Sequence, residues 1–138
     1  MKNDNHIILV VEDDEVSCEL FKELFEKDNI KTFLIVKEGE EAIEICKNNH
    51  AISLVLMDIK LPGINGYDAL KEIKKVRYDL PVVAQTACIM NDAKDLYLNS
   101  GFDDFISKPI NSGELTRLIE KYREPLFNQM SDIGFHGK

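Results

Sequence analysis

The chain has 138 residues, the length of one ordinary domain, and 44% of them are hydrophobic, which is enough for a single core without disulfide or metal staples. Its 25 acidic and 17 basic residues give a net charge of −8. So acidic a surface repels phosphate backbones and anionic lipids, which argues against nucleic-acid binding and a membrane-surface role. The first apolar run, Ile7 to Val11, is too short for a signal peptide or a membrane span, which predicts a cytoplasmic protein.

Five short apolar segments, rich in β-branched residues, are typical of strands. They are residues 7–11, 31–36, 52–57, 81–86 and 102–106. The first and third are almost continuously apolar, as in central parallel strands that are covered on both faces. The second and fifth are more mixed, which suits strands near the edges of a sheet.

Helical patterns lie between and after these segments. Their apolar positions recur every three or four residues, at Val16, Leu20 and Leu24 with Phe21 and Phe25 beside them, at Ala42, Ile45 and Cys46, at Leu70, Ile73 and Val76, at Ala93, Leu96 and Tyr97, and at Leu115, Leu118, Ile119 and Tyr122. Gly101 is typical of a left-handed cap after the fourth helix, and Asn111 or Ser112 can cap the start of the fifth. We expect Glu124-Pro125 to end the fifth helix.

Strands that alternate with helices predict an α/β domain with a parallel sheet, and right-handed crossovers then place helices on both faces. We expect this domain to cover residues 1–125. Residues 126–138 would form a short tail that is too small for an output domain.

Polar residues interrupt the apolar pattern where several predicted strands end. The acidic run 12–15 follows the first strand, Asp58 follows the third, Thr86 ends the fourth, and Lys108 comes after the fifth. In an open doubly wound sheet, ligands bind along the edge formed by the carboxyl ends of the strands. This edge is therefore the predicted functional site.

Three of these residues, Glu12, Asp13 and Asp58, converge if the first and third strands are neighbours. Close carboxylates repel one another unless a cation joins them, and their hard oxygen ligands favour Mg²⁺. The acidic run and Asp58 can also be explained by local structure, without a metal. Acids at 12–15 suit the positive end of the first helix dipole, and Asp58 can cap a turn into residues 61–63.

Asp58 is also a candidate nucleophile toward phosphorus, because carboxylates form acyl phosphates in some phosphoryl-transfer proteins. Mg²⁺ would neutralise the charge that develops, Lys108 would bind one phosphoryl oxygen, and the hydroxyl of Thr86 would donate to another. The chain has no glycine-rich phosphate-binding motif, and its acidic first turn would repel FMN or NAD. No histidine lies at a predicted strand end, which disfavours a hydrolase triad.

With these residues placed, the sequence resembles the response-regulator receiver domains of two-component signalling. The resemblance covers about residues 5–123, and its carriers are residues 9–15, 54–66, 85–87 and 103–110. It implies a flavodoxin-like fold, with a doubly wound five-stranded parallel sheet in the order 2-1-3-4-5 and five helices.

The resemblance also implies residue roles at the metal site. Asp58 would accept a phosphoryl group from a histidine of a partner kinase or phosphotransfer protein. Asp13, Asp58 and the backbone carbonyl of Lys60 would bind Mg²⁺ directly, and Glu12 would act mainly through water. Lys60 and Cys88 would flank the attacking water, and since neither activates water, we expect slow self-dephosphorylation.

The resemblance also implies residues for a conformational switch that phosphorylation of Asp58 would drive. Thr86 and Lys108 would contact the phosphoryl group, and Thr86 would act with the ring of Phe105, which has no hydroxyl to donate in either state. The face formed by the fourth helix, fifth strand and fifth helix would then change for binding an unknown downstream protein, as a monomer or a phosphorylation-dependent dimer. The Lys108-Pro109 bond would be cis.

The sequence leaves open the context of the domain and two other classes of function. The domain is either a stand-alone regulator or a receiver excised from a hybrid histidine kinase. A Mg²⁺-dependent phosphohydrolase using Asp58 is a second class of function, although Lys60 stands where such enzymes commonly carry a second acid. A third class is a binding domain that works without phosphorylation. The leading interpretation is a signalling module rather than a metabolic enzyme.

Overall fold

The computed structural model of the protein describes residues 6–87 and 99–131, with residues 123–131 described by their backbone alone. Its elements, in chain order, are β1 (Ile7–Val11), α1 (Glu15–Lys27), β2 (Phe33–Val36), α2 (Gly39–Asn48), β3 (Ile52–Asp58), α3 (Gly66–Val76), β4 (Val82–Thr86), β5 (Asp104–Ser107) and α5 (Ser112–Ser131). The predicted helix around Ala93, Leu96 and Tyr97 lies outside the described residues.

The five strands form one parallel sheet in the order β2-β1-β3-β4-β5, which confirms the predicted topology. The chain runs from β1 to β2 on one side and then returns to β3 on the other side. Because β1 and β3 are neighbours with connections leaving in opposite directions, the switch point of this doubly wound sheet lies between their carboxyl ends. The more mixed strands, β2 and β5, are the edges as predicted.

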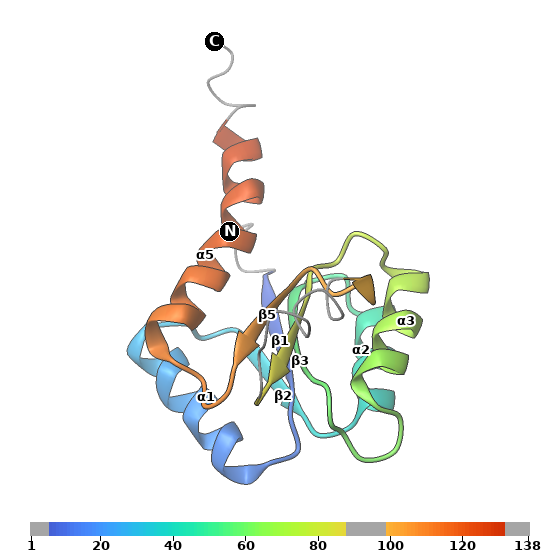
Figure 1. The fold of residues 1–138 in the computed structure, drawn as a ribbon. Coiled ribbons are helices and arrows are strands. Elements are labelled where there is room, and N and C mark those ends of the chain that lie inside the picture. Colours follow the sequence, from blue (N-terminus) through green and yellow to red (C-terminus); the bar gives the residue numbers. More distant parts are fainter. Residues whose placement is uncertain (1–5, 88–98, 132–138) are drawn as a thin grey trace.

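Helices cover both faces of the sheet (Figure 1). On one face, α2 and α3 pack against a cluster of buried side chains that includes Leu9, Val55 and Ala84. On the other face, α1 and α5 enclose a second cluster that includes Val10 and Leu56. Alternate residues of each central strand therefore enter different cores, which explains why these strands read as continuous apolar runs.

In α1 and in α3, one residue of the predicted apolar stripe is exposed rather than buried. In α1 the buried residues are Cys18, Phe21 and Phe25, whereas Val16 is 76% exposed. At 3.6 residues per turn, Val16 lies on the side of the helix opposite this stripe, whereas Leu20 and Leu24 are partly buried against the same core. In α3 the helix buries Leu70 and Ile73, but its last residue, Val76, is exposed.

The last helix begins as predicted and ends later than predicted. Asn111 is its cap, because the Asn111 Oδ1 accepts a hydrogen bond from the Glu114 N–H over 3.0 Å. Pro125 does not end α5, which continues to Ser131, so the start of the predicted tail is helical. A proline removes one backbone donor, but its φ suits a helix, and these last turns project beyond the sheet (Figure 1).

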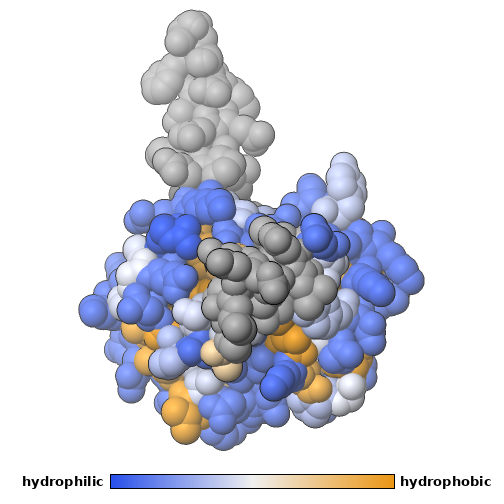
Figure 2. Space-filling view, viewed as in Figure 1, coloured by the Kyte–Doolittle hydropathy of each residue, from blue (hydrophilic) through white to orange (hydrophobic). Residues whose placement is uncertain are grey.

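Two further local features agree with the sequence. The Lys108-Pro109 bond is cis, and Gly101 has a φ of 108°, the left-handed region that favours glycine. Among the described helices, none is long and apolar enough to cross a membrane. On the face shown in Figure 2, hydrophilic residues predominate and apolar residues form small separate patches.

Candidate functional site

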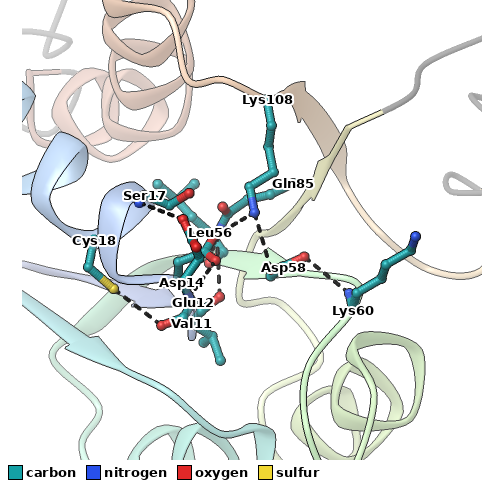
Figure 3. A network of polar contacts seen from close by, with 10 residues as sticks. All are labelled: Val11, Glu12, Asp14, Ser17, Cys18, Leu56, Asp58, Lys60, Gln85 and Lys108. Atoms are coloured by element: carbon teal, nitrogen blue, oxygen red, sulfur yellow. Dashed lines mark hydrogen bonds and ion pairs between the residues drawn. The ribbon is translucent and has the colours of Figure 1, made fainter.

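The predicted site residues come from four neighbouring strands and meet at the carboxyl edge of the sheet. Glu12 directly follows β1, Asp58 ends β3, Thr86 ends β4, and Lys108 directly follows β5. Figure 3 shows the side chains of Glu12, Asp58 and Lys108 pointing toward one another at this edge. The parallel arrangement brings them together because all of these strands end on the same side.

The three carboxylates predicted at the metal site lie close together. One carboxylate oxygen each of Glu12, Asp13 and Asp58 lies within 4.8 Å of the others. Glu12 is fully buried and Asp58 nearly so, whereas Asp13 is exposed. Burial, together with the charge of the neighbouring Asp58, raises the pKa of Glu12 in spite of its contacts with Lys108 and the Asp14 N–H.

Lys108 partly neutralises this cluster. Its Nζ forms ion pairs with Glu12 Oε1 at 2.8 Å and with Asp58 Oδ2 at 3.2 Å. Burial by itself lowers the pKa of the ammonium, but the contacts with Glu12 and the charge of Asp58 outweigh it, so the pKa of Lys108 is raised. When all four groups are ionised, the three carboxylates and the ammonium leave two negative charges, which matches a divalent cation.

These residues fit Mg²⁺ in their chemistry. The donors are carboxylate oxygens, the hard ligands that Mg²⁺ selects, and the exposed Asp13 leaves one side of the cluster accessible to the water ligands that Mg²⁺ retains. The Lys60 N–H donates to Asp58 Oδ1 over 3.1 Å, so the chain after β3 bends back along the Asp58 carboxylate.

A close backbone approach supports this loop. The Gly66 N–H donates to the Ile59 carbonyl oxygen over 2.9 Å. A Cβ at Gly66 would lie 2.5 Å from the Asp58 carbonyl oxygen and 2.7 Å from the Ile59 Cα, both of them backbone atoms. Glycine is therefore required here to hold the loop against the strand that carries Asp58.

The two predicted switch residues lie on neighbouring strands. Thr86 is almost fully buried at the end of β4, and the Lys108 N–H donates to its carbonyl oxygen over 2.9 Å. Phe105 pairs with Ala84 in the β4–β5 register and packs, partly buried, against the core on the α2 and α3 side. Cys88 lies outside the residues that the structure describes.

Sequence reasoning missed two residues beneath this site. Gln85 is fully buried, and its Nε2 donates to the carbonyl oxygens of Leu56 and Val11. Cys18 on α1 donates through its Sγ to the Glu12 carbonyl oxygen over 3.3 Å. A glutamine inside an apolar strand was the available signal for Gln85, whereas the contact of Cys18 depends on how α1 lies over the sheet.

The family is shown by comparison with known proteins. A family model described as the response regulator receiver domain matches residues 8–120. The chain belongs to this family. Receiver domains are signalling modules of two-component systems rather than metabolic enzymes, so the signalling interpretation of the sequence is confirmed at that level.

Similar proteins support the same assignment of this receiver domain. The polar-differentiation response regulator DivK of Brucella ovis is 32% identical over 118 residues, which cover 83% of this chain and 94% of DivK. The receiver domain of the sensor histidine kinase PA1611 from Pseudomonas aeruginosa, solved with a magnesium ion in its active site cleft, has a TM-score of 0.75 and 26% identity, covering 85% of this chain and 96% of that one.

A third relative of this receiver domain is known in a complex. The receiver domain of Ssk1 from Saccharomyces cerevisiae, solved with the histidine phosphotransfer protein Ypd1, also has a TM-score of 0.75 and 26% identity. The match covers 85% of this chain and 88% of the Ssk1 domain.

Proposed function

We propose that this receiver domain accepts a phosphoryl group on Asp58 from a phosphohistidine of a partner protein, with Mg²⁺ bound beside it. The observation that carries the proposal is the grouping of Asp58 with two further carboxylates and the ammonium of Lys108. The magnesium in the cleft of the PA1611 receiver and the phosphotransfer protein bound to the Ssk1 receiver support it.

Asp13, Asp58 and the backbone carbonyl of Lys60 would bind the ion directly, and Glu12 would hold it mainly through water. The ion would supply positive charge that lowers the repulsion between Asp58 and the incoming phosphoryl group. Lys108 would then exchange its ion pairs with the carboxylates for a phosphoryl oxygen, and its raised pKa keeps it protonated for that role.

The transfer itself needs no oxidant or further reactant. A carboxylate oxygen of Asp58 attacks phosphorus, an O–P bond forms, and the P–N bond to the donor histidine breaks with its electron pair remaining on the imidazole nitrogen. Water would later cleave the acyl phosphate slowly, since neither Lys60 nor Cys88 provides a group that activates it.

The expected output is a change of surface. Thr86 would move its hydroxyl toward the phosphoryl group, and Phe105 would turn inward, which changes the face around β5 and α5. This face would bind a downstream protein or a second copy of the chain. We place the receiver unit at residues 1–125 in the cytoplasm, either as a stand-alone regulator or as part of a hybrid kinase, without a nucleic-acid or membrane partner.

Intact mass after incubation with acetyl phosphate tests the proposal. We expect one added phosphoryl group that requires Mg²⁺ and is absent in Asp58→Asn. The matched control is Asp68→Asn, an exposed carboxylate in the first turn of α3, which should still be phosphorylated. A wild-type protein that binds Mg²⁺ but acquires no group from acetyl phosphate or from a phosphorylated histidine phosphotransfer protein would contradict it.

The same experiment separates the other two functions. A phosphohydrolase would turn over a small phosphate ester many times, whereas the receiver carries a single group. A domain that binds its partner without phosphorylation would capture that partner equally well as wild type and as Asp58→Asn. Two residues after Asp58, where such phosphohydrolases commonly carry a second carboxylic acid, this chain has Lys60, and we therefore expect no multiple turnover.

A further inference from the structure

Gln85 contacts both strands that carry the carboxylates, yet the proposed phosphotransfer gives it no role. It is fully buried on β4 and pairs with Asp58 in the β3–β4 register. Its Nε2 donates to the Leu56 carbonyl oxygen over 2.8 Å and reaches the Val11 carbonyl oxygen at 3.5 Å. One carboxamide thus links the ends of β1, β3 and β4.

The two carbonyl groups determine which way round this carboxamide lies. Carbonyl oxygens only accept hydrogen bonds, so the amide nitrogen of Gln85 must face them and its Oε1 must face away. Oε1 is buried, and no donor contacts it within the described part of the chain. Burying an amide oxygen without a donor costs free energy, so glutamine is not the residue that best stabilises this position.

We propose that Gln85 is a positioning residue for the metal site. Its carboxamide holds the carboxyl ends of β1 and β3 at the spacing that lets Glu12, Asp13 and Asp58 bind one cation. The geometry carries this, because Val11 directly precedes Glu12 and Leu56 lies two residues before Asp58. A change in the spacing of the two carbonyls therefore changes the spacing of the carboxylates.

The inference rests on the proposed function, since it concerns the same site. Partners that orient metal ligands change metal affinity by about 10–100-fold when they are removed. Gln85 acts through the backbone rather than on a ligand atom, so we expect an effect near the lower end, about tenfold. A site that trades stability for metal affinity explains why the buried Oε1 has no donor among the described residues.

Gln85→Met tests this, because methionine has a similar length but neither donates nor needs a partner. We expect the Kd for Mg²⁺, measured by calorimetry, to rise about tenfold. Thermal unfolding without Mg²⁺ should occur at an unchanged or higher temperature, because the unpaired amide is gone. Phosphorylation by acetyl phosphate should slow at low Mg²⁺ and recover at saturating Mg²⁺, since the loss lies in metal binding.

Val83→Ala is the matched control. Val83 lies two residues earlier on β4, on the same face of the strand, and is fully buried in the core on the α1 and α5 side. Its truncation should lower the unfolding temperature through lost packing and leave the Kd for Mg²⁺ unchanged. The two variants therefore move stability and metal affinity independently if the proposal is right.

Gln85→Met with wild-type affinity for Mg²⁺ and a lower unfolding temperature would show that Gln85 serves packing alone. If that variant does not fold, Gln85→Asn replaces it, because its shorter side chain withdraws the amide from both carbonyls. Wild-type affinity in Gln85→Asn would overturn the inference equally. A wild-type protein that binds no Mg²⁺ refutes the metal site itself, which is a different result.

Discussion

Replacing Lys108 by methionine tests whether its ammonium supplies part of the positive charge that the carboxylates need. Methionine occupies much of the same stem but carries no charge. The Lys108 Nζ lies 2.8 Å from Glu12 Oε1 and 3.2 Å from Asp58 Oδ2, and Glu12 is fully buried. At an effective dielectric constant of about 20, these distances correspond to gross attractions of about 6 and 5 kcal/mol.

The net loss in the free energy of unfolding is smaller than these attractions, because water solvates the same groups in the unfolded chain. Removing one partner of a buried ion pair costs roughly 3–5 kcal/mol. Protonation of Glu12 relieves part of this, so we expect a loss of about 3 kcal/mol at neutral pH without Mg²⁺, or a Tm roughly 10 °C lower. The pKa of Glu12 is raised above its usual value of 4.5 in the folded protein. Lys108 lowers that pKa in the wild type, so the folded Lys108→Met variant binds a proton on Glu12 more readily, and its loss of stability should shrink as pH falls.

Urea unfolding followed by circular dichroism, with a chelator present, measures this difference. The control is Lys75→Met on the surface of α3. The Lys75 side chain is 69% exposed, and its Nζ lies 3.0 Å from Glu72 Oε2. Exposed pairs contribute about 0–1 kcal/mol. Mg²⁺ should restore more stability to Lys108→Met than it adds to wild type. A Lys108→Met stability within about 1 kcal/mol of wild type would refute the reasoning.

Two further predictions concern the same site. Gly66→Ala forces a Cβ against the backbone of Asp58 and Ile59, so we expect a loss of about 1–3 kcal/mol in urea unfolding and about tenfold weaker Mg²⁺ binding by calorimetry. Gly113→Ala, in the first turn of α5, should leave Mg²⁺ binding unchanged. Mg²⁺ affinity should rise with pH through the raised pKa of Glu12, because a bound proton competes with the ion. Glu12→Gln should flatten this dependence, and an equally steep titration in that variant would assign the competition to another group.

The fold was largely readable from local patterns. Each central strand is a continuous apolar run because both of its faces are covered, and the runs at residues 7–11 and 52–57 match β1 and β3 to within one residue. The two segments with a more mixed composition form the edge strands, β2 and β5. The apolar spacing mispredicted burial where burial depends on which part of the sheet a helix residue faces. Val16, for example, continues a four-residue spacing but faces solvent.

The positions of the polar and charged site residues were also readable from the chain. Glu12, Asp58, Thr86 and Lys108 each follow or end a predicted strand, and parallel strands that share one sheet end at the same edge. The alternation of strands and helices predicts the parallel sheet, and the strand order that the family resemblance implies then brings these residues together. The roles implied for them by the family resemblance remain proposals to be tested by phosphorylation.

Patterns along the sequence determined the parallel sheet and the edge where acidic residues gather, because strand periodicity and crossover handedness are local rules. The order of the strands came from the resemblance to receiver domains. Only the tertiary structure decided that Lys108 contacts two carboxylates and that Gln85 contacts the carbonyl oxygens of Val11 and Leu56. These contacts join residues far apart in the chain. They depend on the lateral spacing of strands and the reach of individual side chains, which no pattern along the chain encodes.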